Sequence, residues 1–301
     1  MAARPPSGAR CLTDLHRTPA PPDRSPRDDE IDVHGLTHVG KVRRENQDQF
    51  LIASFHKQVH VLASSLGADH LPPRDTRLGV VAMVADGVGG GEGGAEASST
   101  ALETAMRYVD ESMACFYRAG SHEQDLIDAL QAAASHAHDA IRGRKSASGR
   151  LGTMATTLTL WMGVWPAYYL LQVGDSRYYH YRHGTLTQVS RDQTIAQELV
   201  DEGVMSRTAA FRTQFANVLS SALGADHSMP VVTRLQSEWN TVHLLCSDGL
   251  TKHVSDDRIA ERLANMTGAR QVAEQLLQDA LDGGGTDNIT IIVGRAVPGS
   301  P

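Results

Sequence analysis

Apolar positions along the chain follow two periods, a short one typical of strands and a longer one typical of helices. Short apolar runs predict strands at Gln49–Ala53, Leu78–Ala85, Met154–Met162, Ala167–Val173, Arg177–Tyr181, Val231–Leu235, Thr241–Cys246 and Asn288–Val293. Longer amphipathic segments predict helices at Ala95–Arg118, Glu123–Arg144, Gln193–Glu202, Asp256–Asn265 and Ala269–Leu281.

The order of these segments predicts the fold class. The strands Ala167–Val173 and Arg177–Tyr181 are separated only by residues 174–176, and such a short connection can join only antiparallel strands. The long helices come in pairs, one pair after the second strand and one before the last. Two helix pairs can cover the outer faces of two sheets. We therefore expect an α+β protein, an α-β-β-α sandwich with two antiparallel sheets flanked by helix pairs.

Composition divides the 301 residues into a tail and one domain. Residues 1–30 hold six of the twelve prolines and few large apolar side chains, which predicts a disordered tail, with a targeting or docking role as the alternative. Residues 31–297 have the composition of a single globular domain. Within it, the polar segment 54–77 predicts a long hairpin loop, and the irregular segment 203–229 predicts a flap.

The charge and the cysteines narrow the class of protein. The formal net charge is −7, so the chain lacks the basic surface required for binding nucleic acid or anionic lipid. Cys11, Cys115 and Cys246 are widely spaced and fit neither a disulfide framework nor a zinc motif. No run approaches the ~18 apolar residues of a membrane span, and no signal-peptide core follows Met1. We expect a soluble, cytoplasmic protein.

Four aspartates lie next to strands that should be buried. Asp48 and Asp287 precede a predicted strand, and Asp86 and Asp248 follow one. A turn explains any one of them, but four such positions are harder to dismiss. Carboxylates gathered at one sheet edge repel one another, and a hard cation such as Mn²⁺ or Mg²⁺, which prefers oxygen ligands, removes that repulsion. The sequence has no paired His or Cys pattern that would indicate zinc.

Two segments point to phosphate. Residues 86–94 include six glycines, which allow close approach of the backbone to a ligand, although the ending of a P-loop is absent and a flexible turn is the alternative. We expect Gly87 to offer its carbonyl. Arg43 lies five residues before Asp48 and can present two donors to phosphate oxygens; an arginine on a solvated strand is the alternative.

Six short motifs occur in one order along the chain. They are Arg43-x-x-Asn46-x-Asp48, Ala85-Asp86-Gly87-x-Gly89-Gly90, Gly152-Thr153-Met154-Ala155-Thr156-Thr157, Val173-Gly174-Asp175-Ser176-Arg177, Cys246-Ser247-Asp248-Gly249-Leu250 and Gly285-Thr286-Asp287-Asn288-Ile289-Thr290. Each is weak alone. Together, over about residues 32–295, they resemble the metal-dependent serine/threonine protein phosphatases of the 2C type, in their bacterial form.

The resemblance implies an activity and a set of site residues. The implied reaction is hydrolysis of phosphoserine and phosphothreonine in proteins by a metal-activated water, without a covalent intermediate. The implied cofactors are two Mn²⁺ or Mg²⁺ ions and a third, weaker divalent cation. The implied roles are metal binding by Asp48, Asp86 (bridging), Gly87, Asp248 and Asp287, third-metal binding by Asp175 with Asp248, phosphate clamping by Arg43, and orientation of neighbouring groups by Asn288. The implied partners are a phosphorylated protein and a serine/threonine kinase or its targets, and we expect a monomer.

Four positions depart from the family pattern. Val88 stands where many eukaryotic members have a general-acid histidine, which implies that a metal-bound water protonates the leaving oxygen. Gln47 replaces an acidic residue and is expected to weaken metal binding. Gln193 replaces a histidine, with little effect expected because that position is remote from the metals. Met154 is a conservative change in a core strand.

Two other functions fit parts of the pattern. One is a phosphatase-like binding module without turnover, which the intact aspartates and Arg43 argue against. The other is a metal-dependent hydrolase of small phosphoesters or nucleotides, which only substrate profiling separates from a protein phosphatase. The flap at 203–229 is our candidate for substrate selection.

Overall fold

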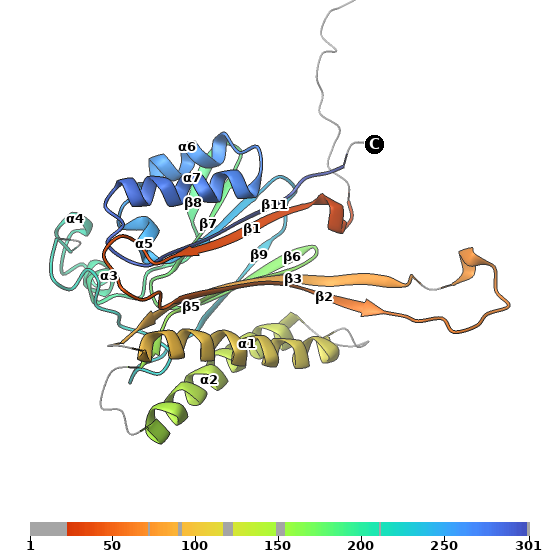
Figure 1. Ribbon diagram of the computed structural model, residues 1–301, viewed down its shortest axis with the longest axis horizontal. Coiled ribbons are helices and arrows are strands. Elements are labelled where there is room, and N and C mark those ends of the chain that lie inside the picture. The colour runs from red at the N-terminus through yellow and green to blue at the C-terminus, as the bar shows by residue number, and fades with distance from the viewer. Residues whose placement is uncertain are drawn as a thin grey trace, which may run out of the picture.

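The computed structural model describes residues 23–71, 73–89, 92–116, 123–148, 154–210 and 212–299. Two sheets pack face to face, and helices cover the outer face of each (Figure 1). Every pair of neighbouring strands is antiparallel. The predicted fold class, an α-β-β-α sandwich, is confirmed.

The first sheet has the strand order β1-β11-β10-β7-β8. Its strands are β1 (Ile31–His38), β7 (Arg177–Arg182), β8 (Thr185–Gln188), β10 (Val242–Cys246) and β11 (Ile289–Ala296). The second sheet has the order β2-β3-β5-β6-β9, and a short strand, β4, pairs with β3 outside this order. Its strands are β2 (Asp48–Gln58), β3 (Asp75–Val88), β4 (Ala155–Thr156), β5 (Leu158–Val164), β6 (Ala167–Val173) and β9 (Val231–Gln236).

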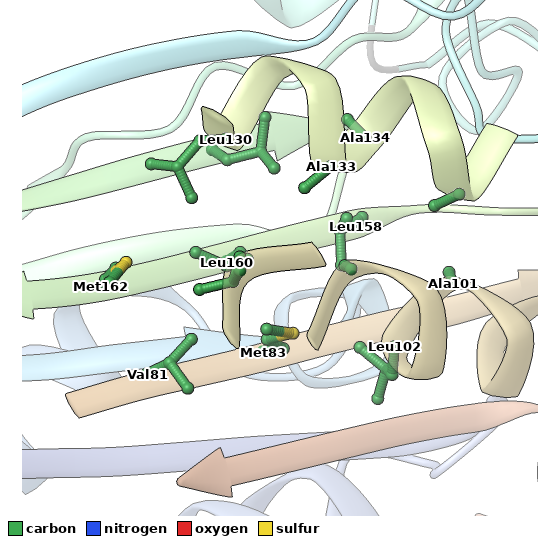
Figure 2. Packing of buried hydrophobic residues seen from close by; sticks show 14 of the residues in the cluster. Val81, Met83, Ala101, Leu102, Leu130, Ala133, Ala134, Leu158, Leu160 and Met162 are labelled. Carbon is green, nitrogen blue, oxygen red and sulfur yellow. The ribbon is translucent and has the colours of Figure 1, made fainter. Parts of the chain in front are cut away.

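Each sheet has its own pair of covering helices. Helices α1 (Gly93–Phe116) and α2 (Glu123–Ser148) pack on the second sheet, and α6 (Asp256–Ala264) and α7 (Ala269–Asp282) pack on the first (Figure 1). Most apolar positions that repeat at helical spacing in α2 lie in the core: Leu126, Leu130, Ala133, Ala134, Ala137 and Ile141 are buried. Figure 2 shows this layer, in which α1 and α2 contact Met83, Leu158 and Leu160 of the second sheet.

The space between the sheets is filled mainly by large side chains. Tyr178 and Tyr168 are buried there with Leu245 and Ile292. The Tyr178 hydroxyl lies 2.6 Å from Nδ1 of His243. These side chains fill the space between the two sheets. The acidic residues described below lie at one end of the sandwich.

Several elements differ from the sequence predictions. Strands β1 and β8 and the short helices α4 (Arg207–Ala210) and α5 (Asp248–Thr251) were not predicted. Strands β2 and β3 extend to Gln58 and from Asp75, so the hairpin loop covers 59–74 and not 54–77. The two strands continue past their apolar positions because the hydrogen bonds between strands also form where the side chains are exposed.

The N-terminal boundary also differs. Residues 1–22 lie outside the described residues, as do Cys11, the side chain of Cys115 and the Gly152–Thr153 pair. Residues 28–30, placed in the predicted tail, form a 3₁₀ helix, and Glu30 accepts hydrogen bonds from Arg24 at 2.6 Å and 2.7 Å. The ordered body therefore begins before residue 31, since an ion pair fixes this segment on the domain.

Candidate metal centre

The predicted aspartates converge at one end of the sandwich. Asp48 opens β2 and is paired with Asp86 in the β2–β3 register. Asp175 lies in the turn between β6 and β7, Asp248 begins α5 directly after β10, and Asp287 lies just before β11. Asp86 was expected at the tip of its strand. In the structure, β3 continues for two more residues beyond it, to Val88.

These residues line or underlie a cleft of about 1010 Å³. Asp86, Asp175, Asp248 and Asp287 are in its wall, together with Arg43 and Lys252, and Asp48 lies beneath. The cleft is therefore acidic at its floor and basic at its rim.

Asp48 joins the two sheets. Its side chain is 1% exposed, and Oδ2 accepts hydrogen bonds from Ser247 Oγ at 2.7 Å and Thr290 Oγ1 at 2.8 Å, both on the first-sheet side. The other oxygen, Oδ1, is buried without a hydrogen-bond partner. Burial raises the pKa of Asp48 to about 6, although the two hydroxyls oppose this. A buried carboxylate with one unpaired oxygen is costly unless a cation completes it.

Asp86 and Gly87 form a tightly held segment. The Asp86 amide donates to Thr157 Oγ1 at 2.9 Å, and its carbonyl accepts from the Thr157 amide at 2.9 Å. Burial, followed by the charges of Asp48 and Asp248, raises the pKa of Asp86 well above its usual value. A Cβ on Gly87 would overlap the carbonyl of Gly94, so only glycine fits there. Gly90 and Gly91 of the glycine-rich run lie outside the described residues.

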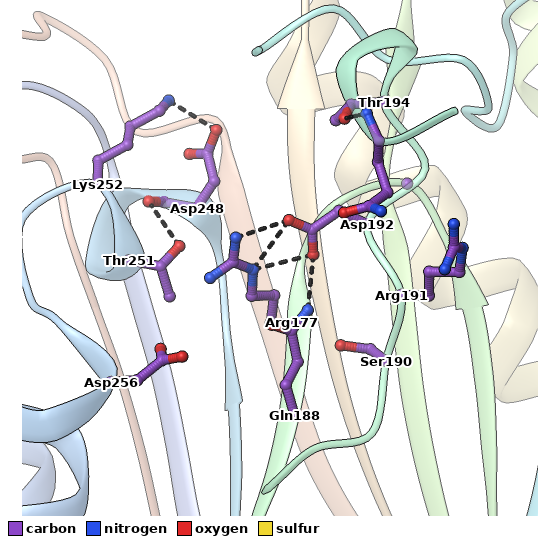
Figure 3. Close-up of polar contacts among 12 residues, drawn as sticks. Arg177, Gln188, Ser190, Arg191, Asp192, Thr194, Asp248, Thr251, Lys252 and Asp256 are labelled. Atoms are coloured by element: carbon purple, nitrogen blue, oxygen red, sulfur yellow. Dashed lines mark hydrogen bonds and ion pairs between the residues drawn. The ribbon is translucent and has the colours of Figure 1, made fainter. Parts of the chain in front are cut away.

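Asp248 and Asp287 are held by basic side chains. Lys252 Nζ lies 2.6 Å from Asp248 Oδ2 and 2.7 Å from Asp287 Oδ2. Arg43 donates from Nε to Asp287 Oδ1 at 2.7 Å and from Nη2 to Oδ2 at 2.9 Å. Figure 3 shows Lys252 reaching to Asp248 from the next turn of the chain. Asp248 Oδ1 is buried and has no hydrogen-bond partner.

Asn288 organises the loop that carries Arg43. Its Oδ1 accepts from the Gln47 amide at 2.9 Å, and its Nδ2 donates to the carbonyls of Val39 and Glu45, each at 2.9 Å. A Cβ on Gly249 would overlap the Asn288 carbonyl, which explains the glycine after Asp248. Both amide atoms of Asn288 are thus used to position the loop.

A buried ion pair lies beside the acidic end. Arg177 donates to Asp192 from Nη2 at 2.6 Å and from Nε at 2.9 Å (Figure 3). Burial, then the charges of Asp248 and Asp192, raise the pKa of Asp175 to about 8. Asp175 thus shares the electrostatic environment of the other carboxylates.

Gln193 is closer to the acidic end than expected. Its Oε1 accepts from the Gly174 amide at 2.7 Å, next to Asp175, and its Nε2 donates to the Met229 carbonyl at 2.9 Å. Its own carbonyl accepts from the Ser220 amide at 3.0 Å. Gln193 thus connects the Asp175 turn to the 203–229 segment, and the small effect expected of this replacement stays a prediction.

The 203–229 segment is irregular, as predicted, but part of it is fixed in place. Residue 211 lies outside the described residues. Helix α4 follows α3 (Ile195–Asp201) closely, and residues 217–222 line the cleft. Leu223 is fully buried and pairs with Thr156. The part next to the cleft therefore forms part of the cleft wall.

The donor set suits a hard metal ion. Over the described ranges, no three His, Cys, Asp or Glu residues are arranged as a ready metal cage. Lys252 contacts Oδ2 of Asp248 and Oδ2 of Asp287, and Arg43 contacts Oδ1 of Asp287. The two buried, unpartnered oxygens, Asp48 Oδ1 and Asp248 Oδ1, nevertheless fit the oxygen preference of Mn²⁺ and Mg²⁺.

Comparison with known proteins identifies the family. A family model described as protein phosphatase 2C matches residues 58–282. The chain belongs to the protein phosphatase 2C family. The match includes Asp86, Asp175 and Asp248, and it agrees with the resemblance seen in the motifs.

Similar proteins of known name include a bacterial phosphatase whose structure is solved. The chain is 36% identical over 173 residues to the serine/threonine protein phosphatase PstP of Mycobacterium tuberculosis, covering 58% of this chain but only 34% of that protein. The crystal structure of PstP/Ppp from that organism superimposes with a TM-score of 0.72 and 29% identity, over 89% of this chain and 99% of that chain. A PstP catalytic domain in complex with two manganese ions gives a TM-score of 0.68 at 28% identity, over 89% of this chain and 99% of that chain.

Proposed function

We propose that the chain hydrolyses phosphoserine and phosphothreonine in proteins with the help of two Mn²⁺ or Mg²⁺ ions. The observation that carries this is the pair of buried carboxylate oxygens without partners, Asp48 Oδ1 and Asp248 Oδ1, beneath a cleft with a basic rim. Family membership and the manganese complex of PstP support the same conclusion.

The proposed metal-binding groups are those at the floor of the cleft: the side chains of Asp48, Asp86, Asp248 and Asp287 and the carbonyl of Gly87. Asp175 with Asp248 would hold a third, weaker cation. When bound, the ions supply an activated water as the nucleophile and offset charge on the phosphoryl group.

The residues of the chain orient the substrate. Arg43 lies at the rim with its side chain 56% exposed, so it is placed to contact a phosphoryl group entering from solvent. Asn288 fixes the loop of Arg43, and Thr157 fixes the backbone of Asp86. The cleft wall at residues 217–222 would contact the protein around the phosphorylated residue, which places substrate selection in this segment.

We further infer the setting of the activity. Residues 31–297 form the catalytic domain, extended by the contacts of residues 24–30, and the substrate is a phosphoprotein from serine/threonine kinase signalling. We place the protein in the bacterial cytoplasm as a monomer. No helix within the described residues is long and apolar enough to cross a membrane.

Hydrolysis assays test this function directly. The full chain is assayed at neutral pH on p-nitrophenyl phosphate and on a phosphothreonine peptide, with Mn²⁺ and with EDTA, beside Asp248→Ala. We expect activity on both substrates that requires Mn²⁺ and is lost in the variant. Activity on the small ester alone would favour a small-phosphoester hydrolase. A folded, Mn²⁺-treated chain without activity on either would favour a binding module.

A further inference from the structure

Lys252 contacts two of the clustered carboxylates, Asp248 and Asp287, and it was not among the site residues predicted from the sequence. It follows α5, one helical turn after Asp248, and its Nζ lies 2.6 Å from Asp248 Oδ2 and 2.7 Å from Asp287 Oδ2. Asp287 comes from a different element, the loop before β11. One ammonium group therefore bridges two carboxylates that are 39 positions apart in the chain.

The bridge is a strong electrostatic contact. The Lys252 side chain is 27% exposed, and those of Asp248 and Asp287 are 18% and 17% exposed. A lysine ammonium is charged at neutral pH, and here it lies within hydrogen-bonding distance of two carboxylates.

This cation takes the same oxygens that a metal ion would need. Lys252 holds Oδ2 of both aspartates, and Arg43 Nε holds Oδ1 of Asp287 at 2.7 Å. Asp248 Oδ1 is the oxygen of this pair that has no partner. An ammonium and a divalent ion on the same two oxygens repel each other and compete for the oxygen lone pairs, so the lysine weakens the binding of the metal ion.

We propose that Lys252 is an internal competitor of the metal: it holds Asp248 and Asp287 together in the metal-free protein and must release them when a divalent cation binds both. The proposal rests on the two-metal function proposed above. It predicts a metal centre that binds its ions less tightly than its carboxylates alone would allow, and a metal-free protein that stays folded because its aspartates are already paired.

The test is Lys252→Met, which keeps most of the side-chain volume and removes the charge. Binding of Mn²⁺ to the EDTA-treated and dialysed full chain is measured by titration calorimetry, and the melting temperature is measured with and without Mn²⁺. We expect Mn²⁺ affinity to rise by about tenfold or more, because hydrogen bonds between charged groups no longer compete. We also expect a lower melting temperature without metal and a larger rise when Mn²⁺ is added.

Two further variants isolate the cause. Lys57→Met removes the same charge from the exposed hairpin and should leave Mn²⁺ affinity unchanged within about twofold, as expected for a screened, distant charge. Lys252→Arg keeps the cation and should bind Mn²⁺ much as the wild type does. If Lys252→Met is unfolded without metal but folds when Mn²⁺ is added, that result also supports the competition.

Equal or weaker Mn²⁺ binding by folded Lys252→Met would overturn the proposal, as would an equal gain in Lys57→Met. The proposed function is judged separately, by Mn²⁺-dependent hydrolysis in the wild type. An active wild type with an unchanged Lys252→Met affinity would refute the lysine's role alone. An inactive wild type whose Lys252→Met variant binds Mn²⁺ more tightly would refute the activity alone.

Discussion

The space between the two sheets contains polar groups in two regions that are built in opposite ways. In the acidic centre (Asp48, Asp86, Asp175, Asp248 and Asp287), like charges are gathered and two buried oxygens have no partner. In the aromatic cluster (Trp161, Tyr168, Tyr178 and His243), the polar atoms belong to neutral groups, and Tyr178 pairs with His243 at 2.6 Å. The acidic centre gathers like charges that repel one another, whereas the aromatic cluster packs neutral rings, although its Trp161 Nε1 is also buried without a hydrogen-bond partner in the part of the chain that the structure describes.

The difference indicates that the clustered carboxylates reduce the stability of the metal-free protein, whereas the proposed function requires them. Removing the charge of Asp86, which has no basic ion-pair partner among the described residues, should help the metal-free fold and abolish activity, whereas changes in the aromatic cluster should weaken the fold and spare activity. Each of the following predictions tests one side of this contrast, and they are ordered by the size of the expected effect.

Asp86→Asn should have the largest effect. We expect kcat on p-nitrophenyl phosphate with Mn²⁺ to fall by roughly 10³-fold, because metal ions contribute several kcal/mol to the transition state. The melting temperature in EDTA should rise, since a carboxylate close to Asp48 and Asp248 loses its charge. Asp110→Asn, on the exposed face of α1, is the matched control and should change neither quantity. A metal-free variant less stable than the wild type would contradict the contrast.

Tyr178→Phe should act on stability alone. The substitution leaves Nδ1 of His243 without its partner inside the sandwich, at a cost of about 1–3 kcal/mol in the free energy of unfolding, measured in urea. The kcat of the folded variant with Mn²⁺ should match that of the wild type. Tyr181→Phe, on the same strand, is the control. A large loss of activity at unchanged stability would show that the two regions are coupled.

His243→Gln should change the dependence of stability on pH. Burial, with a smaller contribution from His180, lowers the pKa of His243 from 6.5 to about 3. Between these values the unfolded state binds more protons than the folded state, so this histidine makes stability fall as pH falls below about 6.5, by up to about 1.4 kcal/mol per pH unit. The glutamine variant cannot titrate, and its urea-derived stability should fall less steeply from pH 6.5 to 4. Identical slopes would mean that the pKa of His243 is the same in the folded and unfolded states.

Most elements could be predicted from apolar periodicity because their buried faces are continuous. β1 could not, since its residues are mostly half-buried and its sequence, IDVHGLTH, alternates weakly. The ends of β2 and β3 are exposed, so their pairing leaves no hydrophobic signal. The four-residue helices α4 and α5 are too short to show a period.

The candidate site could be predicted in part for a similar reason. An aspartate beside a buried strand can be recognised in the sequence as a candidate ligand, because a carboxylate in that position needs a partner. Lys252 carries a weak signal, four residues after Asp248, and such i,i+4 pairs are common on any helix. The hydroxyls of Ser247 and Thr290 that hold Asp48 come from another sheet, so only the folded chain shows their partner.

The long hairpin of β2 and β3 has a consequence for how the protein could be handled. The same two strands that carry Asp48 and Asp86 run outward to Gln58 and Asp75 and project beyond the body (Figure 1). Eleven residues of strand span roughly 35 Å at about 3.3 Å each. A dye or a surface linker attached in the loop 59–74 would therefore be separated from Asp48 and Asp86 by the length of the two strands. The hairpin offers a point for immobilising or labelling the protein without covering its cleft.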